Sequence, residues 1–179
     1  MDTAYYSTRR HDVGYVLYLF SHSLCLVLTT TLPTMKKERN VKLRKVKNKT
    51  AQKNRAWVSF SLYIRLRDCL ATTGDREWGI CVTCGERKHF KELQAGHAIS
   101  GRSNAILLDE ELVNAQCQRC NNYEGGNHGI YSVWFIKKYG MDKWEEKVRL
   151  SKQTKVDIDW DEKTLEYRQK YQELLDNIS

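Results

Sequence analysis

The sequence predicts an α+β fold in which a short β-hairpin is braced by two pairs of cysteines and flanked by α-helices on both sides. Three observations support this prediction. Cys81 and Cys84 form one Cys-x-x-Cys pair, and Cys117 and Cys120 form a second. Short apolar segments lie between the two pairs, and apolar residues recur at helical spacing before and after them. We therefore expect one small core with helices on each side.

The length and composition suit one domain with tails. The chain has 179 residues, of which 41% are hydrophobic and 29% are charged, which is ordinary for a protein with a modest core. We expect an N-terminal extension at 1–34, a basic and flexible arm at 35–55, and a folded domain at 56–179. Within that domain, the cysteine-bearing core at 78–128 precedes a helical part at 129–179.

The positive charge is concentrated in one segment. The formal net charge is +8, and residues 36–55 alone carry ten Lys or Arg against one acid. Such a segment suits a phosphate backbone, because each neutralised phosphate releases counterions. Contact with nucleic acid through residues such as Lys42, Arg44 and Lys45 is one interpretation. A solvated, disordered tail without a partner is the other.

The one long apolar run lies near the N-terminus, at 13–28, and follows a pair of arginines. This resembles the start of a signal peptide, but polar residues interrupt the run and no A-x-A cleavage pattern follows it. The run is also short for a transmembrane helix. Met35 directly precedes the basic segment and suits the start of the folded protein. We favour an upstream extension over a targeting segment for 1–34, with no membrane association and a cytoplasmic location.

Four helices are expected outside the hairpin. Their predicted positions are 51–72, 131–139, 142–150 and from Asp159 or Asp161 towards the C-terminus. Gly74 and Gly140 are expected to end the first two. Aromatic residues on these helices could stack on bases, but their spacing is more typical of a core. Cys69, on the first helix, is interpreted as a buried and inert thiol.

The two cysteine pairs predict a structural zinc site. Zinc prefers four tetrahedral thiolates, and a Cys-x-x-Cys turn supplies two of them. Gly85 follows Cys84 and can adopt the positive φ of such a turn, while the second pair would begin a short helix. Knuckle, hairpin and helix in this order form a treble-clef arrangement. Redox dithiols or disulfides are the alternative reading of the same spacing.

The hairpin is predicted from residues 90–99 and 105–108, which read as strands separated by a turn-like SGRSN segment. His97 stands at the end of the first strand, among polar residues. They are Ser100, Arg102, Asn104, Asn114, Asn121 and Asn127. A histidine among uncharged polar groups suits phosphoryl transfer, because histidine can deprotonate water while amides orient ligands.

The frame Cys-x-x-Cys, Gly-His, Cys-x-x-Cys-Asn resembles the HNH (ββα-metal) nucleases of the treble-clef kind. More narrowly, the segment 95–127 (AGHAISGRSNAILLDEELVNAQCQRCNNYEGGN) resembles the phage recombination protein family NinG, also called Rap. The resemblance runs from about Ala56 through the last helix and leaves 1–34 uncovered. It implies a structure-selective DNA endonuclease of recombination, with branched DNA such as Holliday junctions as substrate.

The resemblance also implies roles for individual residues. His97 matches the general base, and Asn121 matches a common ligand of the catalytic divalent ion, Mg²⁺ or Mn²⁺. Asn114 lies near the middle motif position, which orients the base or binds substrate. Zinc on the four cysteines would be structural, and Arg102 with the basic arm would hold the DNA backbone. A symmetric junction would suit a homodimer.

Two departures from the family pattern stand out. Many HNH enzymes carry an acidic or histidine metal ligand directly before the general base, where this chain has Gly96. The residue five positions before the cysteine, often the middle motif residue, is Leu112. Asp109, Glu110 and His128 are candidates for the missing ligand. These departures keep open a second interpretation, a non-catalytic zinc module that binds DNA or RNA. An exported, disulfide-bonded protein is a third.

Overall fold

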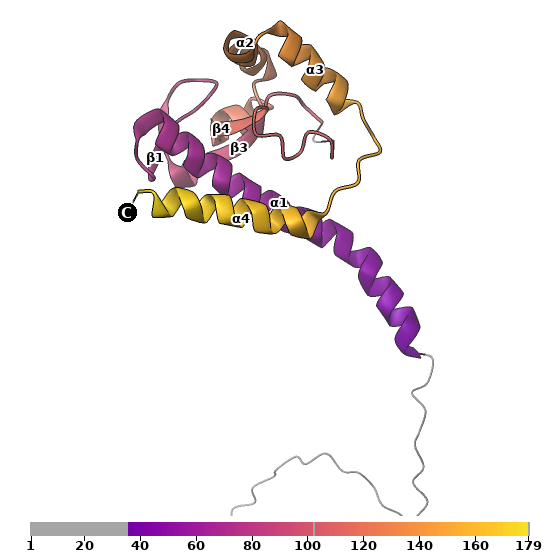
Figure 1. Cartoon of the computed structure of the whole chain (residues 1–179). Helices are drawn as coiled ribbons and strands as arrows, with labels where there is room; N and C mark the ends of the chain where they lie inside the picture. The colour runs from indigo at the N-terminus through magenta and orange to yellow at the C-terminus, as the bar shows by residue number, and fades with distance from the viewer. Residues whose placement is uncertain (1–35, 102, 179) are drawn as a thin grey trace, which may run out of the picture. The chain divides into compact units, whose positions relative to one another are not determined.

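The computed structural model of the chain describes residues 36–101 and 103–178, with side chains in the first helix from residue 49 onward (Figure 1). The elements are α1 (Lys36–Thr73), β1 (Trp78–Ile80), β2 (Arg87–His89), the 3₁₀ turn η1 (Phe90–Glu92), β3 (Leu93–His97), β4 (Val113–Cys117), the short π-helix η2 (Arg119–Tyr123), α2 (His128–Tyr139), α3 (Met141–Ser151) and α4 (Trp160–Asp176). The predicted extension at 1–34 lies outside the described residues.

The predicted α+β class is confirmed. β1 pairs with β2 and β3 pairs with β4, both antiparallel, and helices come before and after the two small sheets. In the β3–β4 hairpin, Gln94 lies opposite Gln116, Gly96 opposite Asn114 and His97 opposite Val113. Because side chains alternate across a strand, Gln94, Gly96, Asn114 and Gln116 share one face of the hairpin.

The predicted second strand at 105–108 is wrong. These residues form turns, in which the Ile106 N–H donates to Ser103 O (3.2 Å), and the pairing strand is β4. The apolar character of 105–108 reflects burial instead, since Ile106 packs against Tyr131 and Phe135 of α2. β4 itself reads VNAQC and is fully buried with polar side chains, so hydropathy does not reveal it.

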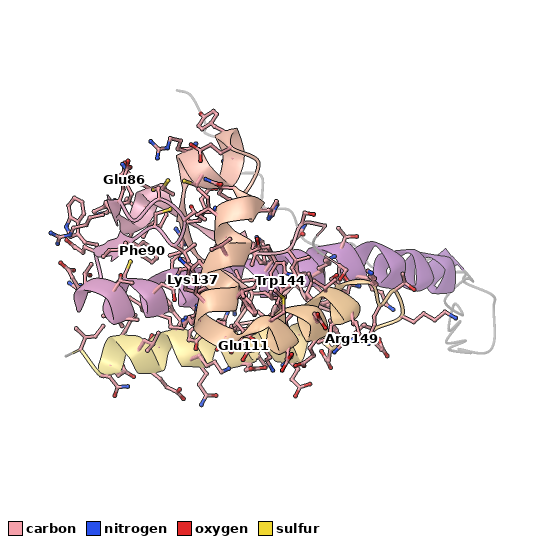
Figure 2. All side chains as sticks on the ribbon, turned by 90° about the horizontal axis from the view of Figure 1, so that it is seen from above. Glu86, Phe90, Glu111, Lys137, Trp144 and Arg149 are labelled. Atoms are coloured by element: carbon pink, nitrogen blue, oxygen red, sulfur yellow. The ribbon has the colours of Figure 1, made fainter. Side chains whose placement is uncertain are left out.

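Helices α1 and α4 cover one face of the hairpin and run side by side in both views (Figures 1 and 2). Phe60 and Ile64 of α1 pack with Ala95, Val113 and, from α4, Tyr167. This confirms the apolar face predicted for the first helix. The helix begins earlier than predicted, at Lys36, because the basic segment contains no Gly or Pro to interrupt it. It ends as predicted before Gly74, which has φ +69°.

Helices α2 and α3 cover the other side. Tyr131 and Phe135 are fully buried with Leu112, and the rings of Phe135 and of Trp144 in α3 have centroids 5.5 Å apart. These aromatic residues therefore belong to the core, as predicted. Asp159 is the N-cap of α4, since its carboxylate accepts from the backbone of Asp161 at 3.0 Å. Within the described part of the chain, no helix has the length and apolar character that crossing a membrane requires.

Candidate functional site

The four paired cysteines converge at the end of the hairpin. The sulfur atoms of Cys81, Cys84, Cys117 and Cys120 all lie within 4.8 Å of one another. A tetrahedral zinc ion with Zn–S bonds of about 2.3 Å separates its sulfurs by about 3.8 Å. The Sγ atoms of Cys84 and Cys117 are 3.8 Å apart. The donor set therefore fits a metal such as zinc.

Local backbone geometry builds this cluster. The Cys81 N–H donates to Glu86 O (2.9 Å), which closes the turn between β1 and β2, and Gly85 takes the positive φ of +72° that the turn requires. Cys117 ends β4 and Cys120 lies in η2, so the second pair begins a short helix as predicted. The Cys117 N–H donates to the Cys81 sulfur (3.2 Å), which joins the two halves of the cluster.

Cys81 of the cluster and the isolated Cys69 differ in acidity. Burial opposes ionisation of Cys81, but backbone N–H groups of Cys117 and Cys84 and the Thr83 hydroxyl lower its pKa to about 6. Burial raises the pKa of Cys69 to about 11. Cys69 is fully buried and lies outside the cluster, which confirms the predicted burial of this thiol.

His97 lies at the far end of the hairpin from the cysteines, and only 7% of it is exposed. Its Nε2 lies 3.1 Å from the carbonyl oxygen of Leu107, and its ring stacks on Trp57 of α1 at 5.2 Å between centroids. A carbonyl can only accept, so Nε2 carries the proton in this contact. In the neutral ring Nδ1 then carries the lone pair, which is the form a general base requires.

A cavity of about 530 Å³ brings His97 and Asn121 together. Its other polar lining residues are Ser61, Arg65, Gln94 and Asn122. None of the described residues that line it carries a carboxylate, and Arg65 supplies a positive charge. A cavity of this character suits an anionic ligand such as a phosphate.

The Asn121 side chain is oriented by its neighbours. Its Nδ2 donates to Gln94 Oε1 at 2.6 Å and lies 3.4 Å from Asn122 Oδ1. Because the nitrogen is engaged with acceptors, the oxygen is the atom left to bind a cation or another donor. Gln94 was not singled out from the sequence, since a lone glutamine in a short strand carries no motif.

Asn114 does not line the cavity. It lies in β4 and is 95% buried, and its Nδ2 donates to the Tyr131 hydroxyl (3.1 Å) and to Glu111 O (3.2 Å). Its Oδ1 accepts from Arg67 (3.2 Å). Arg67 also binds the carbonyls of Glu110 and Val113, so these contacts tie the hairpin to α1 and α2.

The three candidates for the missing metal ligand are engaged elsewhere. Asp109 forms an ion pair with Lys147 at 2.6 Å, and Glu110 forms one with Lys170 at 2.6 Å. The Nδ1 of His128 lies 3.1 Å from Ala98 O. None of these three lines the cavity that holds His97.

Steric crowding explains why position 96 is a glycine. A Cβ at this position would overlap the amide oxygen of Gln116, which stands on the neighbouring strand. No acidic or histidine side chain fits at position 96 while Gln116 keeps this conformation. Gln116 was not singled out from the sequence either, because a strand with polar side chains gives no hydropathy signal.

The predicted DNA contacts are only partly described. Lys42, Arg44 and Lys45 lie in α1 without described side chains, and Arg102 lies outside the described residues. At the C-terminal end of the basic segment, Arg55 pairs with Asp161 of α4 (3.0 Å). Lys53 donates to Asn104 (2.7 Å).

The family comparison covers most of the chain. The model of the family described as bacteriophage lambda NinG protein matches residues 32–177, which contain the basic segment, the cysteine cluster and the cavity. The match begins well before Ala56 and leaves most of 1–34 uncovered. Comparisons with curated proteins and with solved structures give no significant match. Because the family model covers most of its length, the chain belongs to the bacteriophage lambda NinG protein family.

Proposed function

We propose that this protein is a structure-selective DNA endonuclease of phage recombination, which hydrolyses phosphodiesters in branched DNA. The observation that carries the proposal is the placement of His97 and Asn121 at one cavity free of described carboxylates. Membership of a phage family associated with recombination supports the same conclusion. The cysteine cluster, the hairpin and η2 would form the treble-clef core of the HNH nucleases.

His97 would act as the general base. The Leu107 carbonyl fixes the ring through Nε2 and the Trp57 stack limits its rotation. Nδ1 of the neutral ring would then take the proton from the attacking water. Positioned bases of this kind contribute about 10²–10⁴-fold to rate. In this geometry the backbone carbonyl is the group that orients the base.

Arg65 would hold the scissile phosphate. Its Nε donates to Ser61 O (3.2 Å), and its Nη1 lies 3.3 Å from Leu93 O and 3.4 Å from Phe90 O. Nη2 has no hydrogen bond among the described residues, and the guanidinium lies 4.4 Å from the centre of the Phe90 ring. The guanidinium is thus held rigidly with one nitrogen left for an anion. Burial lowers the pKa of Arg65, but arginine stays cationic at neutral pH.

Asn121 would bind the catalytic divalent ion, Mg²⁺ or Mn²⁺, through its oxygen. When bound, such an ion polarises the phosphate and stabilises the leaving oxygen. Gln94 holds the Asn121 amide in the orientation that presents the oxygen. The basic segment at 36–55 and Arg102 would hold DNA through phosphate contacts with little base readout.

A non-catalytic zinc module that binds nucleic acid is the second candidate function. One observation favours it. The position that carries a metal ligand in many HNH enzymes is Gly96, and the Gln116 amide fills the adjacent space. A protein of this kind would bind branched DNA without cutting it.

A cleavage assay separates the two functions. The full chain, loaded with zinc, is incubated with duplex, single-stranded and four-way junction DNA, with Mg²⁺, with Mn²⁺ and with neither. We expect metal-dependent nicking that is strongest on the junction. His97→Ala should abolish it, whereas the control His89→Ala should not, because His89 is a histidine that lies outside the cavity. Junction binding without nicking in either metal would favour the zinc module.

A further inference from the structure

A second cavity, of about 470 Å³, lies between α1 and the segment that leads into α4. We call it the Trp160 cavity. Its lining comes from four residues of α1 between positions 49 and 53, from Asn104, and from residues 156–160. None of these lines the cavity that holds His97. Its volume lies in the range of small-ligand sites, about 300–1,000 Å³.

Polar contacts hold the two sides of the Trp160 cavity together. Asp161, which follows Trp160, accepts from Gln52 at 2.6 Å and from Arg55 at 3.0 Å, so the start of α4 is fixed beside α1. Lys53 of α1 lies over the Trp160 ring, with Nζ 5.8 Å from the ring centre. The fold therefore sets the position of the aromatic ring before any ligand binds.

The lining of the Trp160 cavity combines apolar side chains with balanced charges. Val156, Ile158 and Trp160 are partly buried and supply the apolar part. Two lysines and two aspartates supply the charges, and they are Lys49, Lys53, Asp157 and Asp159. A phosphate would meet two carboxylates here, whereas a flat neutral ring with polar edges would meet an aromatic face and groups of both signs. This lining favours a nucleobase over a phosphate.

Asn104 provides a hydrogen-bond donor for the edge of such a ring. Its Oδ1 accepts from Lys53 Nζ at 2.7 Å. An ammonium group can only donate, so the amide oxygen faces the lysine and Nδ2 faces away from it. Among the described residues, Nδ2 has no hydrogen-bond partner. The exposed carboxylate of Asp157 adds an acceptor, so the cavity offers both kinds of group that a base edge requires.

The two cavities lie along one row of α1. Lys53 lines the Trp160 cavity, whereas Trp57 and Arg65 line the His97 cavity. These positions are separated by multiples of four residues, so they follow one ridge of the helix. The ridge advances about 18 Å from Lys53 to Arg65, the length of about five stacked nucleotides. A single DNA strand can therefore reach both cavities, and the basic segment 36–55 extends its path.

We propose that the Trp160 cavity binds an unpaired nucleobase of branched DNA, stacked on the Trp160 ring, while the strand to be cut continues into the His97 cavity. This inference rests on the proposed nuclease function and gives it a source of selectivity. A base must leave the double helix to enter the cavity, and this costs least where the base is already unpaired. Aromatic rings stack on bases of any sequence, so the site reads the branch and not the sequence.

Binding to a matched pair of DNAs tests this assignment. The probes are two fluorescein-labelled four-way junctions, of which one carries an unpaired adenine at the branch point and the other an abasic residue there. Zinc-loaded full chain with His97→Gln, which blocks cleavage, is titrated into each, and anisotropy gives the Kd. We expect the adenine to tighten binding about 5- to 150-fold, the range for one base stacked on an aromatic side chain.

Variants of the cavity should change this preference for the adenine. Trp160→Ala should abolish it, and Trp160→Phe should keep part of it. Asn104→Ala, which leaves the ring in place, should reduce it. Trp78→Ala is the matched control and should keep the preference, because Trp78 is an exposed tryptophan that lines neither cavity. Zinc content and thermal unfolding show that each variant is folded, and Asn104→Ala decides if Trp160→Ala loses its thermal transition.

The outcomes separate this inference from the nuclease function. An adenine preference that is absent from the parent, or equal in the parent and Trp160→Ala, overturns the assignment even if the unblocked protein cuts junctions. Equal weakening of both DNAs by Trp160→Ala overturns it too, because the ring would then serve the fold alone. A preference that depends on Trp160 in a protein that cuts no DNA keeps the base site and rejects the nuclease.

Discussion

The two faces of the β3–β4 hairpin differ in chemistry although they belong to the same ten residues. The face towards α1 carries the apolar side chains Leu93, Ala95, Val113 and Ala115. The opposite face carries Gln94, Gly96, Asn114 and Gln116. His97 ends the apolar face, where its ring meets Trp57 and the cavity. The hairpin thus joins an apolar layer to an amide layer.

This difference shows how a small domain can separate stability from chemistry. An apolar layer gains free energy in proportion to the area it buries and tolerates changes of shape. A buried amide layer is stabilising only when its donors and acceptors are paired, so it fixes specific geometry instead. In this hairpin the amide layer also reaches the cysteine cluster, because Gln116 donates to Thr83, whose hydroxyl lies 3.2 Å from the Cys81 sulfur.

Removing a cysteine ligand is expected to have the largest effect, because it breaks the metal cluster at the end of the hairpin. Structural zinc contributes on the order of 10 kcal/mol to folding of small zinc domains. Cys117→Ser should therefore lose zinc and the cooperative thermal transition together. Cys69→Ala is the matched control, since Cys69 is buried but outside the cluster. Zinc analysis and calorimetry would contradict this account if the serine variant kept both the metal and the transition.

Truncation of the apolar layer should cost stability alone. Phe60 is fully buried and packs edge-on against Tyr167 at 4.7 Å. Phe60→Ala should lower the free energy of unfolding by about 3–5 kcal/mol, from lost burial and the cavity it leaves. At temperatures below its unfolding transition, the folded Phe60→Ala protein should bind zinc and cut junction DNA as the parent does. Denaturant unfolding and cleavage at equal folded fraction measure the two effects separately.

The sequence predicts the apolar layer and the cysteine cluster well, because both depend on local patterns. Helical spacing predicted a first helix whose apolar residues include Phe60 and Ile64, and the paired cysteines predicted the metal cluster. The amide layer is hidden because polar side chains in a buried strand resemble a loop. The turn at 105–108 resembles a strand in the sequence, because its buried side chains form a short apolar run. The sequence does not predict that Arg65 and Gln94 belong to the site, because they meet only where α1, β3 and η2 line one cavity.

Asn114 offers a test of the amide layer that separates structure from catalysis. Asn114→Ala leaves the buried Tyr131 hydroxyl and Arg67 each without one partner, which should cost about 1–3 kcal/mol. Cleavage by the folded fraction should persist, because Asn114 does not line the cavity. Thermal unfolding and junction cleavage are measured on the same preparation. Loss of cleavage with unchanged stability would instead restore the catalytic role that the family resemblance implies.

The smallest predicted effect lies at the link between α4 and the apolar side of the hairpin. Burial alone raises the pKa of Glu110, but hydrogen bonds from Lys170 and Tyr63 outweigh it, so the pKa lies below its ordinary value. A carboxylate with a lowered folded-state pKa stabilises the fold above its unfolded-state pKa, and this stability is lost as pH falls through the folded-state value.

Glu110→Gln should therefore reduce stability at neutral pH by less than about 1 kcal/mol, since the pair is partly exposed. The difference from the parent should vanish towards acidic pH. Thermal unfolding between neutral and acidic pH checks this. A difference that grew as the pH fell would have the wrong sign.

The central claim is that His97 is the general base. The most direct test is the single-turnover rate of junction nicking by His97→Gln with Mg²⁺. The parent and Phe60→Ala are measured beside it at equal folded fraction. The account predicts that His97→Gln loses about 10²–10⁴-fold in rate while it keeps its zinc and its thermal transition. Phe60→Ala should show the reverse, a lowered transition with the parental rate. Nicking by His97→Gln at the parental rate would contradict the assignment of His97 as the base.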